Sequence, residues 1–157
     1  MRIANFFAFL LIVILLPMTS FAEKSEYGRP PTPEEVVGFW KMVPVPKEMQ
    51  KVNPWPLPYQ WFGFYKNGRL VSMATSEDSD LSAKELEEIF ANASQGAPRY
   101  SWKDDFLIVD YGFEKELWGM NLFSKDFKFI MSGDLMMSLA GEEDLKPVYY
   151  RLLRRVK

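Results

Sequence analysis

The second half of the chain is a series of short apolar and aromatic segments separated by turn residues. We expect strands over residues 99–103, 106–111, 117–123, 127–131, 135–139 and 148–153. Glycine, aspartate, serine and lysine stand between these segments, as is typical of turns. Short strands at such regular spacing predict a mainly β fold, an antiparallel meander that is closed or nearly closed into a barrel.

Three more strands are expected earlier, over residues 36–43, 59–66 and 70–75. The last two form a hairpin, because Asn67-Gly68 between them accepts the positive φ angles of a tight turn. The first arm of this hairpin is apolar on both faces, which carry Phe62 and Phe64, and Trp61 and Tyr65, respectively. This strand is therefore expected to be covered on both sides, or to line an internal cavity with one face.

One amphipathic helix is expected between the hairpin and the later strands. Ser82 with Glu85 three residues on is a capping box, which marks the helix start. The apolar stripe consists of Leu86, Ile89, Phe90 and Ala93. This spacing predicts a helix that lies on the sheet or plugs a barrel mouth.

The first 22 residues have the zones of a cleavable export signal. Arg2 supplies the charge, an apolar run extends from Phe6 to Leu16, and small residues precede a cut after Ala22. The run is shorter than the roughly 20 apolar residues of a spanning helix, although an uncleaved membrane anchor is the alternative. We expect a periplasmic or secreted protein, without stable membrane insertion, made of a signal over 1–22, a polar proline-rich leader over 23–35 and one lipocalin-like domain over 36–157.

Prolines mark two segments of the exported part. The leader carries Pro30, Pro31 and Pro33 and is expected to be loose and to close over one end of the domain. Residues 33–35 are expected to form one helical turn. Residues 44–58 hold five prolines, which forbid a ladder strand and favour an extended loop around Trp55. Trp55 is expected either to act as part of a binding segment or to plug the domain.

Histidine and cysteine are absent from the chain. Serine–histidine and cysteine–histidine nucleophilic sites are therefore excluded, and the usual zinc and copper ligands are missing. Hydrolysis by paired carboxylates remains as an alternative. Its candidate acids stand in predicted turns and are explained as solvated turn residues: Glu77, Asp78, Asp80, Asp104, Asp105, Glu114 and Glu116. We expect a protein that is not an enzyme and that has no metal site and no cofactor.

The charge pattern does not favour a nucleic-acid partner. The net charge is −2, whereas nucleic-acid binding depends on clustered lysines and arginines that neutralise phosphates. The basic cluster of the chain is Arg151, Arg154, Arg155 and Lys157. We interpret this cluster as the solvated end of the last strand.

Short motifs give the chain a resemblance to a known superfamily. Gly38-Phe39-Trp40 is similar to the G-x-W signature of lipocalins and their calycin relatives, and Val109-Asp110-Tyr111 resembles a degenerate T-D-Y motif. The layout also resembles small exported bacterial lipocalin-like domains, although lipocalins keep their helix near the C-terminus. The resemblance implies a calycin-like barrel in which Arg151 packs across Trp40, a cation–π contact with a structural role.

Two functions follow from these patterns. The surplus of large apolar side chains predicts a non-enzymatic protein that holds a small apolar or amphipathic ligand in an aromatic-lined barrel. Its ligand-binding residues would be Trp55 as the lid and Trp61, Tyr65, Tyr111 and Trp118 as the wall. A solid core built from the same side chains is the alternative. The second function is an envelope inhibitor, immunity or assembly factor that presents the proline-rich segment around Trp55 to a protein partner.

Overall fold

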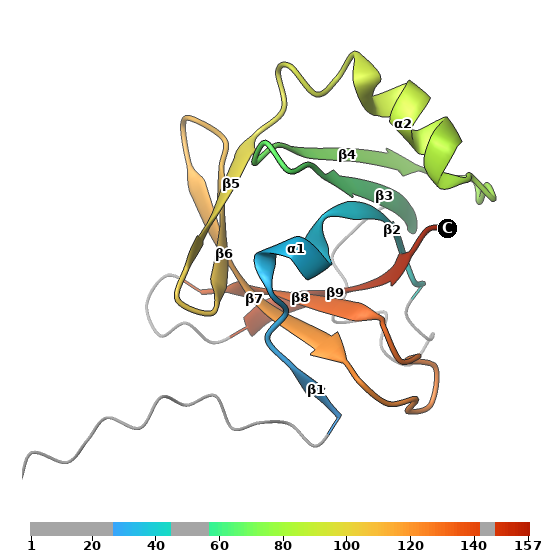
Figure 1. The fold of residues 1–157 in the computed structure, drawn as a ribbon, viewed down its shortest axis with the longest axis vertical. Helices are drawn as coiled ribbons and strands as arrows, with labels where there is room; N and C mark the ends of the chain where they lie inside the picture. Colours follow the sequence, from blue (N-terminus) through green and yellow to red (C-terminus); the bar gives the residue numbers. More distant parts are fainter. Residues whose placement is uncertain (1–26, 45–56, 142–146) are drawn as a thin grey trace, which may run out of the picture.

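A computed structural model describes residues 27–44, 57–141 and 147–157 of the chain. In this part of the chain, nine strands form one antiparallel sheet that curls into a half-barrel, as Figure 1 shows. The elements are β1 (Gly28–Arg29), α1 (Pro33–Val36), β2 (Gly38–Met42), β3 (Tyr59–Phe64), β4 (Leu70–Thr75), α2 (Ala83–Ala91), β5 (Arg99–Lys103), β6 (Phe106–Asp110), β7 (Lys115–Phe123), β8 (Leu135–Ala140) and β9 (Pro147–Arg155).

The strand order is β4-β3-β2-β9-β8-β7-β6-β5, with β1 beside β7. Neighbours in space are thus neighbours in sequence, except where β1 pairs with β7 and where β2 pairs with β9, which places Trp40 opposite Arg155. The two ends of the path meet at a single bridge between Arg69 and Arg99. There Leu70 N donates to Pro98 O at 3.0 Å, and Tyr100 N donates to Gly68 O at 2.8 Å. The predicted antiparallel meander is confirmed as a curled, barrel-like sheet.

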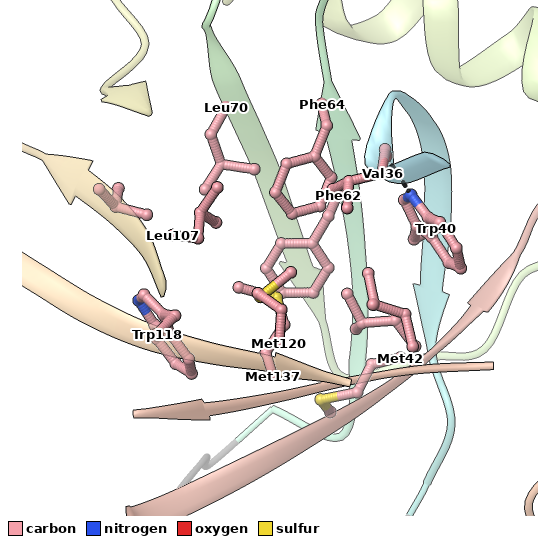
Figure 2. Packing of buried hydrophobic residues seen from close by; sticks show 13 residues of the cluster. Val36, Trp40, Met42, Phe62, Phe64, Leu70, Leu107, Trp118, Met120 and Met137 are labelled. Atoms are coloured by element: carbon pink, nitrogen blue, oxygen red, sulfur yellow. Dashed lines mark hydrogen bonds between the residues drawn. The ribbon is translucent and has the colours of Figure 1, made fainter. Parts of the chain in front are cut away.

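Apolar side chains form two separate clusters, one on each face of the sheet. The inner core lies in the hollow of the half-barrel, and Figure 2 shows its packing around Trp40, Phe62 and Trp118. The outer core lies between the convex face and α2, and contains Trp61, Leu86 and Phe90 among others. Strand β3 contributes alternate residues to the two clusters. The prediction that this strand is covered on both sides is confirmed.

Helix α2 begins at the predicted capping box, where the Ser82 side chain accepts from Glu85 N at 3.3 Å. Leu86 and Phe90 are buried against the sheet, so the helix lies on the outer face rather than in a barrel mouth. The predicted stripe was wrong at its margins. Ile89 is 46% exposed, and the helix ends at Ala91, before Ala93.

The leader is more ordered than expected over its described residues, 27–35. Gly28 pairs with Phe123 in the short strand β1, and the predicted helical turn is confirmed as α1. Thr32 and Glu35 form a capping box, which the sequence analysis did not identify. Val36 continues α1 rather than starting a strand, and it is completely buried in the inner core.

The strand expected over residues 127–131 was wrong. Phe127 and Ile130 form an isolated bridge with two backbone hydrogen bonds of 2.9 Å. Lys128 between them has a φ of 55°, a left-handed conformation that no strand residue adopts. The segment is therefore a tight turn within the connection from β7 to β8.

Candidate functional site

A cavity of ≈330 Å³ lies where β4 and the end of β6 face each other across the gap in the sheet. We call it the β4 cavity. It is lined by Leu57, Gln60, Phe62, Leu70, Ser72, Met73, Ala74, Pro98, Tyr111 and Arg151. Apolar side chains dominate this lining, and Arg151 is its one charged side chain among the described residues. Its volume is at the lower end of the range of about 300–1,000 Å³ for small-molecule sites.

Small side chains keep the cavity open. Ser72 and Ala74 stand opposite Phe62 and Gln60 in the β3–β4 pairing, so their side chains lie on the inner face. Both are nevertheless exposed. On the same face near α1, Phe64 is 1% exposed and packs edge-on against Tyr100, with ring centroids 5.6 Å apart. The inner face is therefore filled at one end and open at the other.

Arg151 lies at the inner side of the β4 cavity and is 9% exposed. Its guanidinium carbon lies 4.7 Å from the ring centroid of Trp118, 5.2 Å from that of Phe62 and 5.7 Å from that of Tyr149. These rings hold the cation in place through their π faces. Burial lowers the pKa of Arg151, and the negative charge of Glu116 opposes that shift.

Glu116 organises the aromatic groups beside this arginine. One of its carboxylate oxygens, Oε2, accepts from Tyr111 Oη at 3.0 Å and from Trp118 Nε1 at 2.9 Å. Burial, followed by the charge of Glu116, raises the pKa of Tyr111. The tyrosine therefore stays neutral and acts as the donor in this pair.

The predicted ligand-binding residues do not form one site. Tyr111 lines the β4 cavity and Trp118 lies beside Arg151, as part of the inner core. Trp61 and Tyr65 belong to the outer core, on the other side of the sheet. The sequence correctly predicted that these two side chains share one face of the strand. The prediction that this face lines the cavity was wrong, because the face with Phe62 lies inside. Trp55 lies outside the described residues, so its role as a lid or as a partner anchor stays a prediction.

The predicted contact between Trp40 and Arg151 was also wrong. Trp40 is buried, donates from Nε1 to Val36 O at 2.8 Å, and stacks with Arg155, whose guanidinium carbon lies 4.2 Å from the ring centroid. Arg155 also donates to Val37 O at 2.9 Å and to Glu35 O. The register explains the difference, since Arg155 is directly opposite Trp40 and Arg151 is four residues away along β9.

The C-terminal basic cluster is solvated only in part, since Arg155 and Lys157 are exposed whereas Arg151 is buried. Arg154 Nη2 lies 2.7 Å from Asp134 Oδ2, and Asp134 is 1% exposed. Arg151 and Arg155 are held against aromatic rings of the inner core. These three arginines therefore have separate structural surroundings rather than forming one cationic surface.

The reasoning from sequence missed Glu116 and Gln60 as site residues. Glu116 was assigned to a turn, yet it belongs to β7 and shares a face with Trp118 two residues on. That spacing of two was the available signal. Gln60 is 5% exposed, lines the cavity and donates from Nε2 to Leu57 O at 3.3 Å. The sequence contains no feature that marks its burial.

Larger depressions elsewhere have a different character. One of ≈530 Å³ lies between the ends of β2 and β9 and residues 78–82. Its charged groups include Lys41, whose Nζ lies 2.5 Å from Asp78 Oδ1, and Arg154, which pairs with Asp134. Another of ≈760 Å³ opens between α1 and Trp102 of β5. Neither has a buried charge within an apolar lining, so the β4 cavity is a stronger candidate for a binding site than these two depressions.

Comparisons with models of protein families, with curated proteins and with solved structures found no match to this chain. Within the described ranges, no helix has the length and apolar character needed to cross a membrane. The same residues contain no group of three acids that could hold a metal ion. Any function assigned to the chain has to come from the chemistry of its own residues.

Proposed function

We propose that the chain is an exported, non-enzymatic binding protein that holds a small apolar or amphipathic molecule in the β4 cavity. The observation that carries this proposal is the unequal filling of the inner face. Small barrels either fill their interior with side chains or keep room for one small ligand. The end beside α1 follows the first pattern, and the end beside Arg151 follows the second.

Two features of the lining support a ligand rather than water alone. Most of the lining side chains are apolar, Phe62 and Leu70 among them, and apolar surface that a ligand buries contributes about 25 cal/mol per Å². On the opposite wall, Ser72 and Ala74 have small, exposed side chains, which leave an opening to solvent. An apolar molecule can enter through this opening without unfolding the sheet.

We also propose that the domain is a calycin-like barrel. The pairing of β2 with β9 and the sequential order of the other strands support it. The bridge between Arg69 and Arg99 brings the two ends of the path together at one point. The export signal over residues 1–22 gives the proposed location, the periplasm or the exterior of the cell.

Native mass spectrometry of residues 23–157, purified without detergent from an exported form, tests the proposal directly. We expect a bound small mass that leaves on denaturation. Isothermal titration with a medium-chain amphiphile such as octanoate then gives the affinity. A bare chain that also binds no apolar or amphipathic probe would overturn the proposal and favour a filled core.

A matched pair of substitutions locates the site. Ser72→Phe fills the β4 cavity from the inner face, so it should abolish probe binding. Ser101→Phe makes the same change on the outer face of β5, where Ser101 is exposed, and should leave binding intact. Equal binding by both variants would place the ligand elsewhere.

A further inference from the structure

Two pairs of aromatic side chains are exposed on the surface of the described part of the chain. Tyr27 and Phe127 are 38% and 43% exposed, and their ring centroids lie 5.1 Å apart. Tyr111 and Phe113 are 36% and 85% exposed, with ring centroids 6.2 Å apart. Exposed apolar side chains that stand singly are ordinary on a protein surface, whereas those that gather mark a contact surface. Both pairs are therefore candidates for contact with a partner.

The first pair lies on the connection from β7 to β8. Figure 1 shows this connection and β1 at the end of the molecule away from β4. The Tyr27 carbonyl accepts from Ser124 N at 2.9 Å, which fixes the tyrosine against the connection. Phe127 and Ile130 are bridge partners, so their side chains lie on the same side of the turn. Met131 follows directly and is 50% exposed. We call Tyr27, Phe127, Ile130 and Met131 the β7–β8 patch.

The charge next to the β7–β8 patch is positive. Lys128 is exposed, and its Nζ lies 5.2 Å from the ring centroid of Phe127. Within the described residues, no acid forms an ion pair with this lysine. The two acids of the same connection are engaged elsewhere, since Asp126 accepts from a backbone amide at 2.7 Å and Asp134 is buried in an ion pair. The patch therefore combines apolar surface with a cation.

The surroundings of the second pair are negative. Tyr111 Oη donates to Glu116 at 3.0 Å, and Glu114 is exposed directly after Phe113. The one lysine of this turn pairs with Asp110 at 3.1 Å. Carboxylates repel an anionic surface, whereas a lysine beside apolar side chains matches the boundary of a bilayer, where anionic head groups meet acyl chains. Charge therefore favours the β7–β8 patch as the one that meets lipid.

The chain that precedes the described residues ends at this patch. Residues 1–26 include the apolar run from Phe6 to Leu16 of the proposed export signal, and Tyr27 is the first described residue. Leu16 and Tyr27 are eleven positions apart, so that even a fully extended chain spans at most about 40 Å between them. A signal held in the membrane thus keeps the patch near the lipid surface, and this proximity strengthens a weak contact.

We propose that the β7–β8 patch is a docking surface for an anionic lipid bilayer. Phe127 and Met131 enter the boundary between head groups and acyl chains, and Lys128 lies at the level of the lipid phosphates. Tyr27 suits the same boundary, because its ring is apolar and its hydroxyl is polar. The docking is peripheral and does not involve the β4 cavity. It goes beyond the proposed binding function, because it places the exported protein at a membrane surface.

Flotation of the exported chain with lipid vesicles tests the docking. The two probes are vesicles of phosphatidylcholine alone and vesicles in which about one third of this lipid is replaced by phosphatidylglycerol. We expect the partition coefficient to be about fivefold higher on the anionic vesicles, as for one lysine near such a surface. The difference should shrink as added salt screens the attraction. Absence of binding, or binding no stronger to the anionic vesicles than to the neutral ones, would overturn the proposal.

A matched pair of substitutions assigns the contact to the patch. Phe127→Ser should weaken partition onto the anionic vesicles at least about tenfold, because it removes apolar surface that the lipid buries. Phe113→Ser is the control, since Phe113 is the more exposed of the two rings but lies beside acids, and it should retain binding. An equal loss in both variants, or no loss in Phe127→Ser, would contradict the assignment. If Phe127→Ser does not fold by circular dichroism, Met131→Ser provides the same test.

A second pair tests the charge. Lys128→Gln should remove most of the preference for anionic vesicles, whereas Lys84→Gln removes the same charge from an exposed position of α2 and should retain it. A dimer in sedimentation that Phe127→Ser converts to a monomer, together with absent vesicle binding, would make the patch a contact between copies and overturn lipid docking. Octanoate binding should be unchanged in all these variants, so failure of the docking is distinguishable from failure of the proposed function.

Discussion

Two tryptophan–arginine pairs lie on the inner face of the sheet, and they differ in what surrounds the arginine. The guanidinium carbon of Arg155 lies 4.2 Å from the ring centroid of Trp40, and its N–H groups donate to carbonyls at the end of α1. The residue as a whole is exposed. Arg151 stacks on Trp118 at 4.7 Å and is 9% exposed beside a cavity. The same chemical pair therefore serves as a clamp at the filled end and forms part of a cavity wall at the open end.

The filled end should carry more of the stability. Trp40→Ala removes a completely packed indole and its hydrogen bond to Val36 O, and should lower the free energy of unfolding by about 3–5 kcal/mol. Urea denaturation measures this effect. Phe113→Ala is the matched control, since Phe113 is 85% exposed and its loss should change stability by less than about 0.5 kcal/mol. Equal effects of the two substitutions would contradict the assignment of Trp40 to the core.

Gly38 provides a second test of the filled end, because its backbone lies close to the Arg155 guanidinium. Its φ is +127°, and a Cβ at this position would lie 2.6 Å from Arg155 Nη1. We expect Gly38→Ala to cost about 1–3 kcal/mol in unfolding experiments. Gly133→Ala is the control, because Gly133 also has positive φ but nothing within 4 Å of its added Cβ. If Gly133→Ala lowered the free energy of unfolding as much as Gly38→Ala, backbone strain alone would explain the loss, and the contact with Arg155 would not contribute.

The sequence predicted the architecture well where side-chain period and turn chemistry agree. The Asn67-Gly68 hairpin and the Ser82 capping box were both correct in type and position. It failed at residues 127–131, where apolar residues resemble a strand but Lys128 adopts a left-handed conformation. It also missed β1, since a pairing of two residues leaves no periodic signal.

The site was harder to predict, for a physical reason. Alternation along β3 separates Phe62 from Trp61 correctly, but which of them faces the hollow depends on how the whole sheet curls. Likewise, Arg151 and Arg155 share one face of β9, four residues apart. The register with β2 decides which of them meets Trp40, and that register is a property of the tertiary structure.

Substitution of the two arginines is the most direct way to break the comparison. Arg155→Met should lower the free energy of unfolding by about 1 kcal/mol, because it removes hydrogen bonds to α1 at a partly solvated position. Arg151→Met removes the contacts of the guanidinium with the rings of Trp118, Phe62 and Tyr149, but it also relieves the desolvation of a buried cation, so the net loss should be smaller than about 1 kcal/mol. Both values come from the same urea titrations. A large loss in Arg151→Met alone would show that the two arginines have the opposite roles.

The smallest expected effect is a loss of stability of α1 at low pH, when the Glu35 carboxylate is protonated. The Glu35 carboxylate accepts from Arg29 at 2.8 and 2.6 Å and from Thr32 N at 2.8 Å, and these bonds, led by that of Arg29, lower the pKa of Glu35 to about 2. Because the pKa is depressed in the folded state, the stabilisation is complete above the unfolded value of about 4.3. It is lost as the pH falls from there toward 2.

Hydrogen exchange at the backbone amides of α1 measures this loss, and protection should fall across that pH window. The size of the effect is limited, since exposed ion pairs contribute little to stability. Glu35→Gln should have weaker protection that no longer depends on pH in this range, whereas Glu34→Gln, outside the capping box, should behave like the wild type. Octanoate binding should be unaffected by either change, because the β4 cavity lies at the other end of the inner face. A simultaneous loss of α1 protection and of probe binding would show that the two ends of the half-barrel are coupled, and the division into a clamp and a site would then be wrong.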